Sequence, residues 1–202
     1  MATNPKSIFD IGSFKTSFKG GLRANRYKIN GPFPKKISEG GPKQVPSFLV
    51  KAASFPESTL GVITIPWRGR NIRLPGDRDY AAWTFTMLDD SDEKTGVRRM
   101  FEKWNELFNE HASNAAPKSA TSGFVPADDE HVTDWSINFL DLKGEEVPNR
   151  AVKLHNCWPV TVAPIPVSFE ATNTLVEYDV TFIYDYITFD VNTGNAKSDS
   201  DS

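Results

Sequence analysis

The amino-acid sequence predicts a mainly β protein, in which a single amphipathic helix packs against antiparallel strands. Three observations predict this fold. Several short segments alternate apolar and polar residues with the period of two expected of half-buried strands. Only one segment carries apolar residues at helical spacing, and stretches rich in glycine and proline separate these elements. The 202 residues, 39% of them hydrophobic, suit one domain with a modest core.

The chain divides into three parts by composition and charge. We expect a flexible basic arm over residues 1–21, a folded domain over residues 22–189 and a disordered acidic tail over residues 190–202. The arm shows neither helical nor strand periodicity. Residues 1–51 hold ten Lys or Arg against two acids, whereas residues 52–189 hold 12 basic and 21 acidic residues. A basic arm on an acidic body favours self-association, and an ordinary solvated charge bias is the alternative.

Proline and glycine dominate the first part of the folded domain. A short strand is expected at residues 26–29, followed by a long irregular loop over residues 30–47 and by extended chain over residues 48–53. Residues 60–74 are extended but interrupted by proline and glycine. They predict a bent edge strand or a two-stranded excursion, which ends in a turn at residues 75–77.

The middle of the chain carries one clear strand and the helix. Trp83, Phe85 and Met87 alternate with threonines, which predicts a half-buried strand. Asp90 and Glu93 resemble a capping box and predict that the helix begins there. The apolar stripe that follows predicts one buried helix face. Its members are Val97, Met100, Phe101, Trp104, Leu107, Phe108 and His111.

The C-terminal half predicts a hairpin and one further strand. After a second long loop over residues 113–130, the alternation from Trp135 to Phe139 predicts a strand. A Lys-Gly pair then predicts a turn, and a returning strand runs through Leu154. The strongest strand signal covers residues 176–186, where aromatic and β-branched residues occupy one face and polar residues the other.

No catalytic or metal-binding constellation stands out in the sequence. His111, His131 and His155 lack the spacing of a zinc site, and Cys157 near His155 suits a core position better than nucleophilic catalysis. We therefore predict no enzyme activity, no metal and no cofactor. The single thiol cannot form an internal disulfide, which fits synthesis in a reducing cytoplasm. No apolar run is long enough to span a bilayer.

Five motifs in register resemble the tail tube protein of contractile-tailed bacteriophages. They are Arg-Asn-Ile-Arg-Leu-Pro-Gly-Asp-Arg at residues 70–78, the Trp-Thr strand at residues 83–87 with Asp89-Asp90, Lys103-Trp104, Trp158-Pro159 and Asp185-Tyr186. The likeness spans residues 23–186. It implies an antiparallel β-sandwich or split barrel with one flanking amphipathic helix. It also implies six subunits per ring, joined into a continuous inner β-barrel, and rings stacked into a tube. The type VI secretion tube protein shares that design.

The resemblance implies a structural virion protein of the tail, assembled in the host cytoplasm. Its hexameric rings would form the inner tube that conducts DNA and the tape measure protein inside a contractile sheath. The implied partners are copies of itself, the tail sheath protein, the baseplate initiator, the tail terminator and the tape measure protein, while DNA passes without tight binding. Two alternatives stay open: a non-polymerising relative such as a tube initiator or terminator, and a nucleic-acid-binding module that uses the basic arm.

The same resemblance suggests which residues make contacts. Inter-subunit and ring-stacking contacts are expected from five charged residues of the extended excursion: Arg68, Arg70, Arg73, Asp77 and Arg78. We also assign the arm to ring stacking. The candidates for a lumen that repels DNA are the polar residues of the last strand: Glu177, Asp179, Thr181 and Asp185. The candidates for weak sheath contacts lie on the outer helix face: Arg98, Glu102, Lys103 and Glu106.

Overall fold

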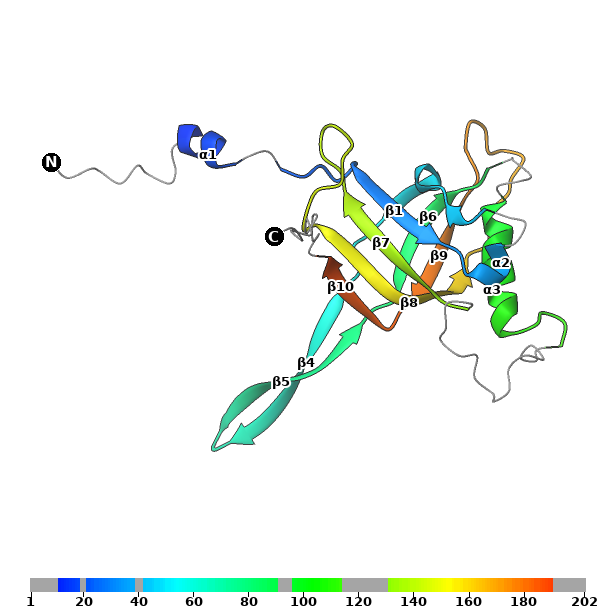
Figure 1. The fold of residues 1–202 in the computed structure, drawn as a ribbon. Helices are drawn as coiled ribbons and strands as arrows, with labels where there is room; N and C mark the ends of the chain where they lie inside the picture. The colour runs from blue at the N-terminus through cyan, green and yellow to red at the C-terminus, as the bar shows by residue number, and fades with distance from the viewer. Residues whose placement is uncertain (1–10, 19–20, 39–41, 91–95, 114–130, 191–202) are drawn as a thin grey trace, which may run out of the picture.

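The computed structural model describes residues 11–18, 21–38, 42–90, 96–113 and 131–190. These residues form ten strands, three α-helices and one short 3-10 helix (Figure 1). The helices are α1 Ile11–Ser17, α2 Lys35–Ser38, η1 Ser47–Leu49 and α3 Val97–Phe108. The strands are β1 Tyr27–Pro32, β2 Gln44–Val45, β3 Val50–Ala53, β4 Ser58–Trp67, β5 Arg70–Tyr80, β6 Trp83–Leu88, β7 Thr133–Phe139, β8 Ala151–Val162, β9 Glu177–Ile183 and β10 Tyr186–Asp190.

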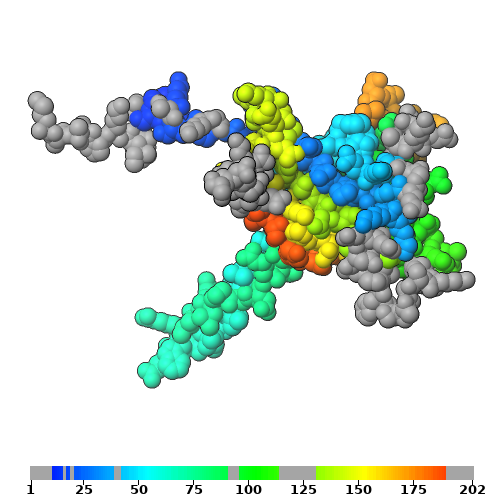
Figure 2. Space-filling model, in the orientation of Figure 1, coloured from blue at the N-terminus to red at the C-terminus, as the bar shows by residue number. Residues whose placement is uncertain are grey.

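All strand pairs are antiparallel, which confirms the mainly β, antiparallel part of the predicted fold class, but the described residues form three α-helices where a single helix was expected. Eight strands form one sheet in the order β2-β1-β7-β8-β9-β6-β3, with β10 also paired to β8. Strands β4 and β5 form a separate two-stranded sheet, a hairpin that projects from the body (Figures 1 and 2). The described strands do not close into a barrel, because β2 and β3 end the large sheet without pairing to each other.

Strand β8 belongs to both halves of the large sheet. Its first part pairs with β10 up to His155 and with β7 up to Cys157, whereas its second part, from Trp158, pairs with β9. Asn156, where the pairing with β7 shifts register, has a φ of 56°, a left-handed conformation in which asparagine is enriched. Asn156 is held by two carboxylates, since Asp134 accepts from its backbone N–H at 3.1 Å and Asp185 from its side-chain amide at 2.6 Å. The bend turns the two halves of the sheet to face each other.

The space between the two half-sheets is filled by aromatic rings. Trp135 of β7 lies with its ring centroid 4.5 Å from that of Phe182 in β9 and 5.4 Å from that of Phe85 in β6. Helix α3 adds Phe101 and Trp104, whose centroids lie 6.0 and 5.5 Å from that of Phe182. These five side chains are at most 1% exposed. The tilted and edge-to-face pairs follow the quadrupoles of the rings.

The prediction for the helix is correct for its buried face and wrong for the residue at which the helix begins. Helix α3 begins at Val97 behind Gly96, and no side chain caps it. The backbone N–H of Asp89 instead donates to the carbonyl of Val176 at 2.9 Å, which keeps that segment extended beside β9. His111 lies beyond the helix end and is exposed. Glu93, the other half of the expected capping box, lies outside the described residues.

The segment expected to be either a bent edge strand or a two-stranded excursion is two-stranded. The turn predicted at residues 75–77 is wrong. The chain reverses at Arg68 and Gly69, whose φ values of 45° and 79° suit a two-residue type I′ turn. Gly76 and its neighbour Asp77 instead form a bulge within β5, opposite Gly61 of β4. A proline beside a bulge removes a donor where the ladder is already interrupted.

The structure also differs from the sequence-based expectation near both ends of the chain. The arm contains α1, and the segment expected to be an irregular loop contains the end of β1, α2 and β2. Ile37 and Val45 explain the latter, because their burial in the core holds these short elements in place. The single strand expected at residues 176–186 divides into β9 and β10 at Asp185, whose N–H donates to the carbonyl of His155 at the bend. Most of the loop expected at residues 113–130 lies outside the described residues.

Candidate assembly surfaces

The β4–β5 hairpin carries an apolar face that the body leaves uncovered. Opposed residues of a two-stranded sheet share a face, so Ile63 and Leu74 lie on the same side as Ile65 and Ile72, with Trp67 at the tip. These five side chains are 43–60% exposed. An isolated hairpin is marginally stable in water, and contiguous exposed apolar patches mark interaction sites. The hairpin is therefore a candidate assembly surface.

All five residues assigned to inter-subunit contacts lie on this hairpin and are exposed. They do not form one cluster. Arg68 and Arg70 lie at the tip, where the Arg68 guanidinium is 5.4 Å from the centroid of a Trp67 ring. Arg73 is opposite Thr64 on the other face of the hairpin, and Asp77 and Arg78 lie near the base: Asp77 in the bulge and Arg78 opposite Leu60. The sequence argument missed the apolar face, which the alternation of Ile63, Ile65 and Trp67 signals.

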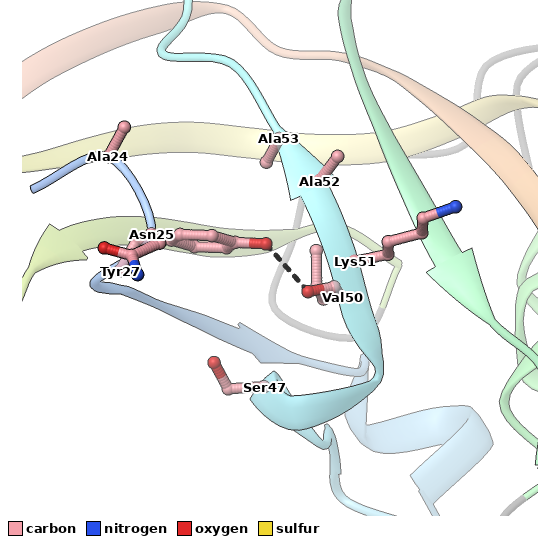
Figure 3. Close-up of a pocket in the computed structure, with 8 residues that line it drawn as sticks. All are labelled: Ala24, Asn25, Tyr27, Ser47, Val50, Lys51, Ala52 and Ala53. Carbon is pink, nitrogen blue, oxygen red and sulfur yellow. Dashed lines mark hydrogen bonds between the residues drawn. The ribbon is translucent and has the colours of Figure 1, made fainter.

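A second candidate surface is the free edge of β3. This strand pairs with β6 on one side, and on the other side an open hollow of about 570 Å³ lies between β3 and the start of β1 (Figure 3). Ala52 and Ala53 line the hollow beside Tyr27, whose hydroxyl donates to the carbonyl of Val50 at 2.8 Å. Partial burial raises the pKa of Tyr27, which keeps the hydroxyl protonated as a donor. The hollow leaves room for a further strand along this edge.

The second part of β8 forms the other free edge of the same half-sheet. Residues 158–162 pair with β9 on one side, while the pairing of β8 with β7 ends at Cys157. The half-sheet β3-β6-β9-β8 thus has an unpaired edge at each end within the described residues. Unpaired edges present backbone donors and acceptors to any strand that can align with them.

The outward face of this half-sheet is polar and holds three of the four lumen candidates. Thr181 contacts Thr84 through the two hydroxyls at 2.9 Å, and Asp179 accepts from the hydroxyl of Thr86 at 2.6 Å. Glu177 forms an ion pair with a lysine of β3, Lys51. Asp185 does not join this face, because it lies at the bend of β8.

The helix residues assigned to the sheath also separate into two groups. Arg98 is turned toward the body: it donates to the carbonyl of Ala163 at 2.8 Å, and its guanidinium lies 5.0 Å from the centroid of the Tyr178 ring. It is 3.7 Å from Glu102, the next residue of the set. Lys103 and Glu106 are exposed on the outer face. Lys103 and Glu106 therefore lie on an accessible surface, whereas Arg98 connects α3 to the sheet.

His155 and Cys157 lie in the body, where neighbouring groups hold them in place. His155 lies between Asp134 at 3.1 Å and Thr188 at 2.8 Å and stacks on Tyr186 with centroids 4.4 Å apart. Burial raises the pKa of the Cys157 thiol to about 12, so it stays protonated. Among the described residues no three His, Cys, Asp or Glu gather to hold a metal ion, and no helix is long and apolar enough to cross a membrane.

The comparisons with known proteins match this architecture. The family model for the phage tail tube protein matches residues 22–189. The tail tube protein of Serratia phage KSP90 is 23% identical over 160 residues, covering 79% of this chain and 84% of that protein.

Two solved structures share the fold. A chain in the baseplate of the anti-feeding prophage has a TM-score of 0.58 at 13% identity, covering 84% of this chain and 95% of its own length. A chain of the sheath–tube complex of an extracellular contractile injection system has a TM-score of 0.53 at 13% identity, covering 89% and 96%.

The fold and its uncovered surfaces are those expected of a structural subunit that contacts other chains. The family match is more specific, because it covers most of the chain, including the hairpin and both free edges. The chain belongs to the phage tail tube protein family, which confirms the resemblance found in the sequence and makes it a component of the virion tail.

Proposed function

We propose that six copies of this chain form a ring and that stacked rings form the inner tube of a contractile phage tail. The observation that carries the proposal is the apolar face of the β4–β5 hairpin, because within the described chain nothing covers it and another subunit can. The tube would conduct DNA and the tape measure protein, with the baseplate initiator and the tail terminator at its two ends.

Ring closure follows from the two free edges of the half-sheet β3-β6-β9-β8. If β3 of one subunit pairs with residues 158–162 of the next, six half-sheets join into one continuous barrel and leave no unpaired edge. The hollow beside Ala52 and Ala53 supports this, since it leaves space along β3. A barrel built in this way needs no closed barrel within the single chain.

The polar face of the same half-sheet then lines the lumen in our proposal. Glu177, Asp179 and Thr181 would face the passing DNA, and the carboxylates would repel the polyanion and limit sticking. Lys103 and Glu106 would meet the sheath, as weak polar contacts that allow the sheath to slide. The basic arm would contribute to ring stacking. The likeness to a sheath–tube complex supports stacking beside a sheath at the level of the fold.

A non-polymerising relative at the end of the tube is the second candidate function. The likeness to a chain of the anti-feeding prophage baseplate favours it as much as the likeness to a tube chain favours the first, because both rest on the fold alone. Polymerisation discriminates between the two. DNA binding through the basic arm and the hairpin arginines is the third, and a steep salt dependence of DNA affinity would be its signature.

The experiment that tests the proposal is negative-stain electron microscopy of the concentrated protein, with sedimentation of the same sample to count subunits. We expect six-fold rings or long hollow tubes. A protein that stays monomeric, even after a baseplate initiator is added, would contradict the tube function and favour a non-polymerising relative. Tight, salt-sensitive DNA binding without rings would favour the third candidate.

A further inference from the structure

A second exposed apolar surface lies at the end of the body opposite the hairpin. The loop over residues 163–176 joins β8 to β9, and Figure 1 shows it, in orange, across the body from the hairpin. Val167, Phe169 and Leu175 of this loop are 86%, 109% and 72% exposed. Nothing in the described part of the chain covers them, and the fold of one subunit does not account for them.

The strand registers establish that loop and hairpin occupy opposite ends of the same strands. Strands β6 and β9 pair from Trp83 opposite Phe182 to Leu88 opposite Glu177. The hairpin leads into β6 at the Trp83 end, and the loop leads into β9 at the Glu177 end. Figure 2 shows the same separation in the space-filling view. Copies stacked end to end would bring the hairpin of one to the loop of the next.

The loop forms a hollow of about 280 Å³ that suits one large apolar side chain. Pro166, Val167, Leu175 and Val176 contribute to its apolar lining, and the Glu177 carboxylate at its edge is already paired with Lys51. Glu170, in the loop itself, carries an exposed carboxylate. The loop therefore offers apolar contact in the hollow and negative charge at Glu170.

The hairpin tip offers the complementary chemistry. Trp67 is 60% exposed, with the guanidinium of Arg68 over one of its rings and Arg70 directly opposite it in the ladder. Tryptophan and arginine are the residue types most enriched among the residues that dominate interface energies. Arginine also pairs with carboxylates in well-defined geometry. The tip thus carries an aromatic anchor beside positive charge.

We propose that the hollow of the 163–176 loop receives the hairpin tip of a second copy of this chain, with Trp67 in the hollow and Arg70 paired with Glu170. The two surfaces lie at opposite ends of one chain, so the contact is heterologous and repeats without closing, as stacked rings require. The inference rests on the proposed tube function and adds the surface that accepts the hairpin.

Cysteine cross-linking tests the contact in the assembled protein. The double variant Trp67→Cys with Leu175→Cys is expected to form a covalent ladder of many subunits under mild oxidation, because each subunit links to one above and one below. A mixture of the two single variants should stop at dimers. The native thiol of Cys157 is buried and does not compete. The control pair Trp67→Cys with Leu142→Cys places the second thiol on a leucine that is also 70% exposed, in the β7–β8 turn, and should give no ladder.

Charge exchange gives a second test that does not depend on disulfide geometry. Arg70→Glu should reduce the fraction of protein that sediments as tubes at least tenfold, and Glu170→Arg in the same chain should restore it. Tubes in which Trp67→Cys links to the Leu142 site, or to neither site, would overturn the inference and leave the tube function standing. So would a failure of Glu170→Arg to restore assembly. A wild-type protein that forms neither rings nor tubes would overturn both.

Discussion

The body and the hairpin contain the same kinds of apolar side chain and treat them in opposite ways. In the body, Trp83, Phe85 and Trp135 are at most 1% exposed and contact one another and Phe182. In the hairpin, the apolar face holds side chains that are 43–60% exposed, such as Trp67. The body therefore gains its stability within one chain, whereas in our proposal the hairpin gains its stability between chains.

Because of this difference, we expect folding and assembly to depend on different residues. Substitutions in the body should change the free energy of unfolding of the monomer, and substitutions on the hairpin should change the association of subunits. If the proposed assembly holds, we expect the chain to stay folded as a monomer until rings form. Two results would contradict this separation. One is a core variant that assembles poorly although its monomer is as stable as the wild type, and the other is a hairpin variant that unfolds the monomer.

The largest expected effect is on the body. Trp135→Ala removes the ring that contacts both half-sheets, and it should lower the free energy of unfolding by about 3–5 kcal/mol. Urea unfolding of the monomer, followed by tryptophan fluorescence, measures it. The matched hairpin variant Trp67→Ala should leave the urea midpoint unchanged. A shift of that midpoint as large as for Trp135→Ala would contradict the separation of the two regions.

The next effect is on the hairpin. Ile72→Asp puts a charge on the apolar face, and it should weaken subunit association by about 2 kcal/mol or more, roughly a 30-fold change, because such anchors dominate interface energies. Sedimentation of rings and tubes measures it. Asn71→Asp, on the other face of the same strand, is the control with the same added charge. Equal losses for the two variants would mean that the charge and not the apolar contact is responsible.

The smallest expected effect is a pH dependence of the stability of the body. Partial burial raises the pKa of Asp134, but the hydrogen bonds from the Lys153 ammonium and the Asn156 N–H outweigh it, so that the pKa of this carboxyl lies below its usual value. Its contribution to stability is thus fully present above about pH 4 and lost as the pH falls through the lowered pKa. Because the Asp134 side chain is 36% exposed, solvent screens these interactions, and we expect less than about 1 kcal/mol.

Unfolding by urea at several pH values measures this contribution. Asp134→Asn should make the stability of the monomer fall less steeply below pH 4. An unchanged acid slope for Asp134→Asn would mean that its partners do not favour the ionised form.

Elements with a strong local pattern could be predicted from the sequence. The alternation around Phe85 gave strand β6, and the stripe through Trp104 gave the buried face of α3, because burial on one face imposes its period on the residues. The hairpin turn could not be predicted. Arginine rarely takes a positive φ, and Arg68 adopts one only because the strands on either side impose a type I′ turn.

For the candidate contact residues, too, some features could be predicted from the sequence and others required the structure. Sequence alone determined the fold class, the family resemblance and the placement of Arg68, Arg70 and Arg73 on one excursion, because these depend on residue type and order along the chain. Only the tertiary structure decided that Arg98 ties α3 to the sheet, that Asp185 lies at the bend of β8 and that the 163–176 loop is opposite the hairpin. Those facts depend on which distant segments of the chain contact one another. Strand pairing and the packing of aromatic side chains in the core determine these contacts, and the local sequence pattern does not.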